Sequence, residues 1–207
     1  ALRPLKQRTI TEQGTQFVLR NDSYDEFANA LTLKRFNSLT GEAGGRSEII
    51  EYHHDPALWV LGQVMKLTAA GAEVESTKFT TTLSQPEKLY SNGLLVETRA
   101  YNGDGTLASV KDGLSKTTTL TNWYRGIPRN IGFADGRSVS ATVNALGQIT
   151  ATTDELGYST GFGYDPMGRV NLVTPPSGDS TAWSSTSITF AMVNDDEYGL
   201  GIGHWKQ

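Results

Sequence analysis

The sequence predicts an all-β protein made of repeated antiparallel β-hairpins that form a curved or spiralling sheet. Three observations predict this class: glycines recur at alternating 10- and 11-residue steps, apolar and polar residues alternate between them, and no long amphipathic helical pattern occurs. The glycines of the series are Gly126, Gly136, Gly147, Gly157, Gly168 and Gly178. A repeat of this kind indicates one small structural unit copied along the chain. Such scaffolds act mainly through their shape and surface.

The glycines close short turn phrases. An aromatic residue or Val is followed by Asp or Asn, two variable residues, Gly, one variable residue and an apolar residue, as at 101–107, 143–149 and 164–170, with a degenerate copy at 122–128. Asp or Asn at the first turn position accepts hydrogen bonds from the amides that follow, and Gly accepts the positive φ that ends the turn. The predicted turn residues are Asp154, Asp165, Gly105, Gly126, Gly136, Gly147, Gly157, Gly168 and Gly178.

Between the turns, side chains alternate with a period of two. The ranges 138–143, 149–153, 158–164 and 170–174 carry Val, Thr, Ala, Tyr and Phe in this pattern, which is typical of half-buried antiparallel strands. The predicted repeat core consists of Tyr101, Val143, Tyr158, Phe162, Tyr164 and Val170. Each strand of roughly six residues would be about 20 Å long.

The regularity of these phrases divides the chain into three parts. Residues 1–89 carry irregular, longer hairpin phrases, residues 90–178 form the regular meander with a 21-residue period, and residues 179–207 form a further, truncated hairpin segment. The best short helix candidate is 24–31. A strand pair is expected from 181 to 190, followed by a solvated acidic loop at 194–197.

The phrases at 154–160 and 164–170 resemble the YD repeat of RHS-repeat proteins. That family includes bacterial polymorphic toxins, the B/C components of insecticidal Tc toxin complexes, wall-associated bacterial surface proteins and the animal teneurins. Residues 24–29 are similar to its YDxxGN phrase, with Ala28 in the place of the turn glycine. Tyr52, Asp55, Trp59, Leu61 and Gly62 match a longer phrase between repeats, and the segments at 182–183, 198–199 and 204–205 are similar to the longer bacterial members.

The resemblance implies hairpins stacked into a strip that spirals into a hollow shell, which in the toxins encloses a C-terminal effector. It implies a non-catalytic, structural segment whose partners are the flanking repeats of a parent protein and an enclosed toxin polypeptide. The parent would be secreted or at the cell surface. An alternative is a surface adhesion or glycan-recognition module, in which Trp123, Trp183 or Trp205 would stack on sugars. A hydrolase of wall polymers is a third, weaker hypothesis.

Four groups of residues are candidates for a metal-binding or catalytic site, and each has a simpler structural interpretation. His53, His54 and Asp55 could form a metal or proton-transfer site, but adjacent residues of a strand point to opposite faces. Asn102–Gly105 is similar to part of a calcium loop but lacks the later oxygen ligands. The acidic run at 195–197 could bind a cation, but such a run is usually a solvated surface. Asp165–Pro166 is similar to the self-cleavage phrase of RHS toxins, but it stands in register with the repeats. We therefore expect no catalytic residue, no metal and no cofactor.

Composition limits the partners. The net charge of −4 gives no basic surface for nucleic acid or an anionic membrane, and no apolar run approaches the roughly 20 residues that span a bilayer. The chain has no cysteine. It begins without Met or a secretory signal, so we expect a piece of a larger protein. Because a strip of hairpins has bare edges, we also expect the isolated chain to form a homo-oligomer or to swap domains.

Overall fold

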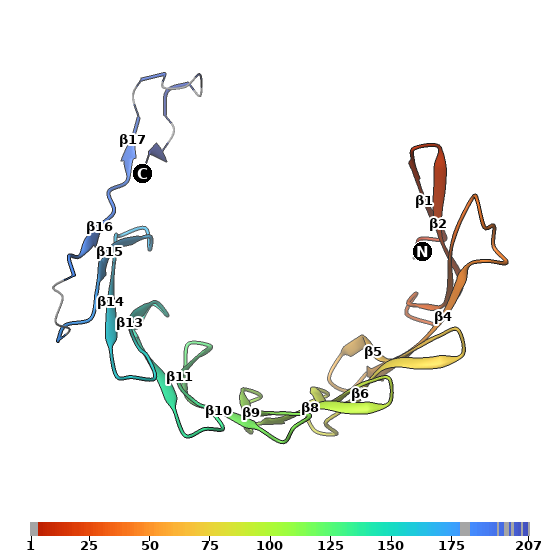
Figure 1. Ribbon diagram of the computed structural model, residues 1–207, viewed down its shortest axis with the longest axis horizontal. Helices are drawn as coiled ribbons and strands as arrows, with labels where there is room; N and C mark the ends of the chain where they lie inside the picture. Colours follow the sequence, from red (N-terminus) through yellow and green to blue (C-terminus); the bar gives the residue numbers. More distant parts are fainter. Residues whose placement is uncertain are drawn as a thin grey trace. The chain divides into compact units, whose positions relative to one another are not determined.

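The computed structural model describes residues 4–178, 183–193, 195–196, 199, 201–203 and 205–206. These residues form strands and turns, and no α-helix occurs among them (Figure 1). The all-β class predicted from the sequence is therefore confirmed. The chain divides into two compact units, which are described separately: unit 1 holds residues 1–101 and 110–116, and unit 2 holds residues 102–109 and 117–207.

Unit 1 is a sheet of antiparallel strands that are adjacent in chain order. Its strands are β1 (Gln7–Glu12), β2 (Thr15–Tyr24), β3 (Ala30–Asn37), β4 (Arg46–Asp55), β5 (Val60–Ala69), β6 (Ala72–Phe79), β7 (Pro86–Ser91) and β8 (Leu94–Tyr101). Strands β2 to β6 are eight to ten residues long. These long strands explain why the sequence phrases are widely spaced before residue 90.

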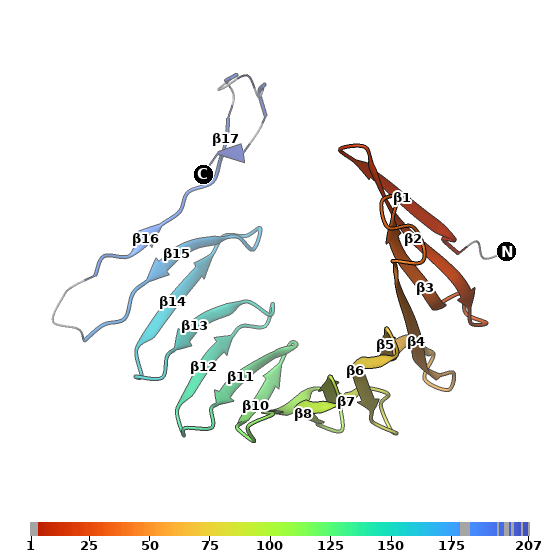
Figure 2. The ribbon, with the colours of Figure 1, turned by 45° about the vertical axis from the view of Figure 1, so that its right-hand side comes forward.

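Unit 2 follows the same plan with shorter strands, which Figure 2 shows in chain order from β10 to β15. The strands of its main sheet are β10 (Thr117–Tyr124), β11 (Ile127–Gly132), β12 (Ser138–Val143), β13 (Ile149–Thr153), β14 (Ser159–Tyr164), β15 (Val170–Thr174) and β16 (Thr186–Ser187). Strands β17 (Ala191–Met192) and β18 (Trp205–Lys206) pair with each other in a separate sheet. Strand β9 (Leu107–Asp112) is divided between the units. From β11 to β15 each strand has five or six residues.

The helix expected at 24–31 is wrong. Strand β2 ends at Tyr24 and β3 begins at Ala30, with a tight turn between them. The Asp25 carboxylate accepts hydrogen bonds from the Phe27 and Asn29 amides at 2.9 and 2.8 Å, and these bonds favour a turn over helical continuation. Of the predicted strand pair at 181–190, residues 181–182 lie outside the described residues, and the remainder holds β16. Of the predicted acidic loop, Asn194 and Glu197 lie outside the described residues.

The sheets have a thin core. Among the described residues, the buried apolar side chains are Leu33, Ala69, Val143 and Val193. The other predicted core residues, Tyr101, Phe162, Tyr164 and Val170, are half-buried. Tyr158 is 44% exposed, because it directly follows a turn and stands at the margin of the sheet. With so little fully buried surface, the fold depends strongly on strand pairing, turns and contacts between successive hairpins.

Candidate functional site in the repeat turns and aromatic staples

One turn geometry recurs along the chain. The first turn residue donates its amide to the carbonyl oxygen four positions later, and the amide of the fourth residue returns to the carbonyl of the first; at Asp165 both distances are 2.9 Å. The pattern occurs at 25–29, 102–106, 112–116, 133–137, 144–148, 154–158 and 165–169. It is a type I turn followed by a residue in the left-handed region, a common hairpin loop that adds one residue to the second strand.

The fourth turn residue always has positive φ, even where it is not glycine. Gly168 has φ 81°, whereas Ala28 and Ser115 each have φ 66° in the same position. Ser115 lies 10 residues after Gly105 and 11 before Gly126, so the series of positive-φ positions continues through a gap in the glycine series. In unit 1 the turn at 25–29 therefore keeps its geometry although Ala28 replaces the glycine. Non-glycine residues in this region are strained, which the flanking hydrogen bonds must offset.

Side-chain oxygens complete most of these turns. The Asp165 carboxylate accepts from the amides of Met167 and Arg169 at 2.9 Å each. The Arg169 amide is the main reason that the pKa of Asp165 lies below its usual value, and the Arg169 guanidinium adds an ion pair at 2.7 Å. That guanidinium also lies 4.2 Å from the ring centroid of Phe190 and 4.5 Å from that of Trp205. The same amide pattern surrounds Asp25, Asp112, Asn144 and Asp154.

The degenerate phrase at 122–128 has a different turn. Arg125 and Gly126 have φ 51° and 77° and form a two-residue hairpin loop between Tyr124 and Ile127, which pair with each other. Asn122 does not cap this turn; its side-chain Nδ2 donates to the Asn130 side-chain oxygen at 2.7 Å. The reason is spacing, because three residues separate Asn122 from Gly126 where the other phrases have two. Gly178, with φ 100°, follows the Pro175–Pro176 pair and stands outside the shared pattern.

Aromatic side chains tie several turns to the turn that lies two places earlier in the chain, on the same side of the sheet, and we call these contacts aromatic staples. The Tyr164 hydroxyl donates to the Ile149 carbonyl at 2.7 Å, and the Trp123 indole Nε1 donates to the Leu107 carbonyl at 2.9 Å. In unit 1 the corresponding bonds run from Tyr101 to Pro86 at 2.8 Å and from Tyr52 to Ala30 at 3.0 Å.

The acceptor of each staple has a constant position. It lies two residues after the positive-φ residue of the turn on the same side of the sheet, two turns earlier, which is Gly147 for Tyr164, Gly105 for Trp123, Ser84 for Tyr101 and Ala28 for Tyr52. A further bond from Tyr24 reaches the Leu5 carbonyl at 2.7 Å. Trp123 is thus half-buried and engaged in a staple, so it does not form the exposed sugar platform considered from the sequence.

Unit 1 adds a side-chain bridge through His54. Its Nδ1 accepts from the Gly62 amide at 3.1 Å, so Nε2 carries the ring proton and donates to Asp25 at 3.0 Å. The ring also packs against Phe27, with centroids 4.7 Å apart. Burial works against ionisation of Asp25, but hydrogen bonds from Asn29, Phe27 and His54 outweigh it and hold the pKa of Asp25 below its usual value.

A second bridge links His53 to the next turn on the opposite face of β4. The His53 ring stacks on Phe79 with centroids 4.5 Å apart, and its Nε2 lies 3.2 Å from the Ser84 hydroxyl. Ser84 donates its proton to Asp55 at 2.5 Å, so His53 must supply the proton of the longer bond. The Ser84 hydroxyl is the main cause that lowers the pKa of Asp55.

This group of His53, Ser84 and Asp55 is not arranged for nucleophilic catalysis. Ser84 is only 2% exposed, and its hydroxyl proton points to a carboxylate instead of to the imidazole that would have to accept it. The two histidines contact different turns from opposite faces, so they do not converge on one ion. Within the described ranges, no group of three or more His, Asp or Glu side chains could hold a metal. In the same residues, no helix is long and apolar enough to cross a bilayer.

The part of the chain that resembled a YD repeat matches a known family. The sequence model of the RHS Repeat family matches residues 143–181, the range that contains the turns at 144–148, 154–158 and 165–169 and the staple from Tyr164. Residues 143–181 are thus similar to an RHS repeat. A search of curated protein sequences found no match.

Solved Tc toxin structures share the fold of this chain. The TcdB2-TccC3 complex without its hypervariable C-terminal region superposes with a TM-score of 0.58, at 10% identity over 82% of this chain and 10% of that chain. TcdB2-TccC3-TEV gives 0.57 at 10% identity over 81% of this chain and 10% of that one. The structure of the Photorhabdus luminescens Tc holotoxin pore superposes with a TM-score of 0.53, at 10% identity over 82% of this chain and 10% of that chain. The chain spans about a tenth of the length of these proteins.

Proposed function

We propose that this chain is a structural, non-catalytic segment of an RHS-repeat shell that encloses or presents a toxin or effector polypeptide. The observation that carries the proposal is the recurrence of one turn and one staple. Each staple fixes a hairpin to the carbonyl that follows the turn two places earlier, so the repeat positions its neighbour by a directed bond as well as by strand pairing.

The use of the polar side chains supports a structural task. The group nearest to a catalytic arrangement consists of His53, Ser84 and Asp55, and its side chains bond to one another across two turns. The side chains of His54 and Asp25 form a second bond between turns. The RHS Repeat match and the likeness to Tc toxin structures support the shell role. The enclosed polypeptide and a secreted or cell-surface parent follow from the same family resemblance.

Protease protection in the complete parent protein tests the proposal. If the repeats form the wall around a polypeptide, limited proteolysis should leave that polypeptide intact in the wild type. A parent carrying both Tyr101→Phe and Tyr164→Phe should expose it to cleavage, because two staples lose their donors. Tyr158→Phe is the matched control, since Tyr158 is exposed and takes no part in a staple.

Two outcomes would contradict the proposal. If the polypeptide proposed to be enclosed is cleaved equally in the wild type and in the doubly substituted parent protein, the result would argue against enclosure. A hydrolytic activity of the purified chain that disappears in Ser84→Ala, while the fold is retained, would overturn the non-catalytic assignment.

Glycan recognition is a second candidate function, and one observation favours it. Trp183, 65% exposed, and Tyr158 line a hollow of about 250 Å³ together with Asp154 and Pro176. An aromatic face beside a carboxylate is suited to a sugar ring. Binding on a glycan array that Trp183→Ala abolishes would support this function, whereas signals at background for both proteins would exclude it.

A further inference from the structure

Two of the repeat turns in unit 2 end in an arginine that neutralises an aspartate of the same turn. Arg137 and Arg169 each pair with such an aspartate, at 2.6 and 2.7 Å between guanidinium nitrogen and carboxylate oxygen. The turn at 154–158 ends in Tyr158 instead. Its aspartate, Asp154, therefore receives no cation from its own turn.

The Asp154 carboxylate uses one of its two oxygens inside the turn. Its Oδ1 accepts the amides of Leu156 and Tyr158 at 2.9 Å each. Its Oδ2 accepts no hydrogen bond and forms no ion pair with any residue that the structure describes. Glu155, the next residue, is exposed and adds a second negative charge. An exposed carboxylate oxygen of this kind can accept a charge-assisted hydrogen bond from a ligand.

Two aromatic rings line the same hollow as Asp154. Trp183 and Tyr158, which are 65% and 44% exposed, surround this hollow of about 250 Å³ together with Pro176. The faces of Trp and Tyr rings carry negative charge density, which attracts cations. The hollow thus combines an acidic oxygen with two aromatic walls.

The turn at 165–169 contains the same combination and also the cation. The Arg169 guanidinium pairs with Asp165 at 2.7 Å and lies 4.2 Å from the ring centroid of Phe190 and 4.5 Å from that of Trp205. One carboxylate and two aromatic rings therefore surround a cation of the chain itself. The hollow at Asp154 offers the same groups to a cation that a ligand would bring.

The hollow is built by connections between strands and not by a strand edge. Asp154 and Tyr158 belong to the turn between β13 and β14, whereas Pro176 and Trp183 belong to the connection between β15 and β16. Alternate connections of consecutive antiparallel strands lie on the same side of the sheet. None of the four residues lies in an outer strand, and β16 to β18 follow them in the chain.

We propose that this hollow recognises a sugar with an unacetylated amino group, such as a glucosamine unit. The inference rests on the glycan recognition proposed above for the same hollow, and it names the class of sugar. The ammonium group donates to Asp154 Oδ2, and the C–H face of the sugar ring stacks on Trp183. A neutral or N-acetylated sugar brings no positive charge to Asp154 and binds less tightly.

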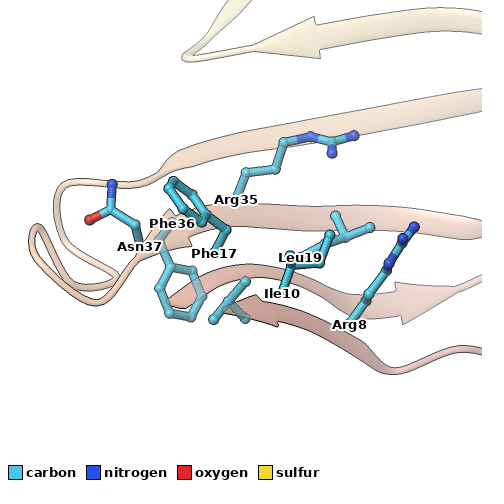
Figure 3. A pocket seen from close by; sticks show the side chains of 8 residues that line it. Arg8, Ile10, Phe17, Leu19, Arg35, Phe36 and Asn37 are labelled. Carbon is cyan, nitrogen blue, oxygen red and sulfur yellow. The ribbon is translucent and has the colours of Figure 1, made fainter. Parts of the chain in front are cut away.

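The larger hollow of unit 1 has the opposite charge. Figure 3 shows Ile10, Phe17 and Leu19 at this hollow of about 400 Å³, whose charged lining residues among those described are Arg8 and Arg35. Guanidinium groups repel an ammonium ion, so an amino sugar should not bind there. The positive charge of the ligand therefore selects the hollow at Asp154.

Isothermal titration calorimetry of the full 207-residue chain tests the inference. The ligands are short oligosaccharides of glucosamine, of N-acetylglucosamine and of glucose with the same linkage, at a pH that protonates the amine. The glucosamine oligomer should bind about tenfold more tightly than either neutral oligomer, as expected for one charge-assisted hydrogen bond.

Substitutions separate the carboxylate from the turn that it caps. Asp154→Asn removes the charge and keeps the turn, because Asn144 accepts the equivalent two amides in its own turn. This variant should bind the three oligomers equally. Asp112→Asn is the matched control, since Asp112 caps its turn in the same way and its substitution removes the same charge, and it should keep the preference for glucosamine. Trp183→Ala should weaken the binding of all three.

The outcomes distinguish the amine preference from glycan recognition itself. Equal binding of all three oligomers by the wild type would overturn the amine preference and leave glycan recognition intact. A glucosamine preference that persists in Asp154→Asn would also overturn it, because the attraction would then come from the net negative charge of the chain. If no oligomer binds, the inference fails, and a glycan array at background level would show that glycan recognition fails with it.

Discussion

The two units contain the same type of turn and staple but differ in strand length and in the side-chain bonds between their turns. Strands β2 to β6 of unit 1 run for eight to ten residues and their turns are bridged by His53, His54, Asp25, Asp55 and Ser84. From β11 to β15 in unit 2, strands of five or six residues follow one another at a constant period with hydrogen bonds mostly local to each turn. Both units keep the staple. The comparison indicates that strand length and side-chain bridges can vary if turns stay fastened to the turn two places earlier.

The largest expected effect comes from breaking a regular turn of unit 2. Gly168→Val should lower the free energy of unfolding by about 3 kcal/mol, because a β-branched residue must adopt φ 81° and its Cβ would lie 3.3 Å from the Gln148 side chain. The matched control is Gly103→Val, whose Cβ would meet open space without positive φ. Urea denaturation of both proteins measures the difference. Equal losses would contradict the assigned role of Gly168.

The bridges of unit 1 should give the next largest effect. Ser84→Ala should cost about 2 kcal/mol, since the Asp55 carboxylate and the His53 nitrogen both lose the buried hydroxyl that they share. Ser138→Ala, at an exposed strand position, serves as the control in the same denaturation experiment. A cost for Ser84→Ala no greater than that of the control would show that unit 1 does not depend on this bridge.

Relief of strain in unit 1 should stabilise it modestly. Ala28→Gly should raise the free energy of unfolding by about 1 kcal/mol, because glycine adopts φ 66° without the clash of a Cβ. Ala134→Gly, which stands at the second position of the turn at 133–137 without positive φ, should instead be neutral or slightly destabilising. A loss of stability in Ala28→Gly would contradict the assignment of this position to the repeat.

Acid should act weakly through the surface ion pairs of unit 1. Hydrogen bonds from Arg20 and then Lys34 lower the pKa of Glu42 from 4.5 to about 2. Because the folded pKa is lowered, this stabilisation is complete above about pH 4.5 and is lost as the pH falls towards 2. Glu42→Gln should therefore flatten the dependence of the denaturation midpoint on pH in that window, by a small amount because the pair is solvated. An unchanged slope would show that the pair contributes nothing.

Much of the fold could be predicted because turn chemistry is local. The Asp or Asn that accepts following amides, the glycine at positive φ and the alternating strands of 138–174 all stand in short stretches of sequence. The turns at Ala28 and Ser115 could not be predicted in this way, because neither residue signals positive φ and only the surrounding pairing imposes it. The helix expected at 24–31 failed because the Asp25 carboxylate accepts the amides of Phe27 and Asn29 and so closes a turn between the paired strands β2 and β3.

The sequence indicates the aromatic donors of the staples but not their acceptors. Tyr101 and Tyr164 stand out as aromatic residues before a turn, but their acceptors are backbone carbonyls of Pro86 and Ile149, which no side chain marks. The Ser84 bridge was missed because a serine in an irregular loop carries no pattern of its own. For Ile149 the signal that could have found the acceptor is its place two residues after Gly147, whereas Pro86 follows Ser84, whose positive φ no pattern in the sequence marks.

Hydrogen exchange on the Tyr164→Phe chain tests most directly whether a staple fastens one repeat to the next. Removal of the hydroxyl should speed amide exchange of the preceding hairpin, at 144–151, by about five- to tenfold, as expected for loss of one hydrogen bond of roughly 1 kcal/mol. Tyr158→Phe should leave exchange in that hairpin unchanged. Equal exchange in the wild type and both variants would contradict the claim that the repeats are joined through their aromatic staples.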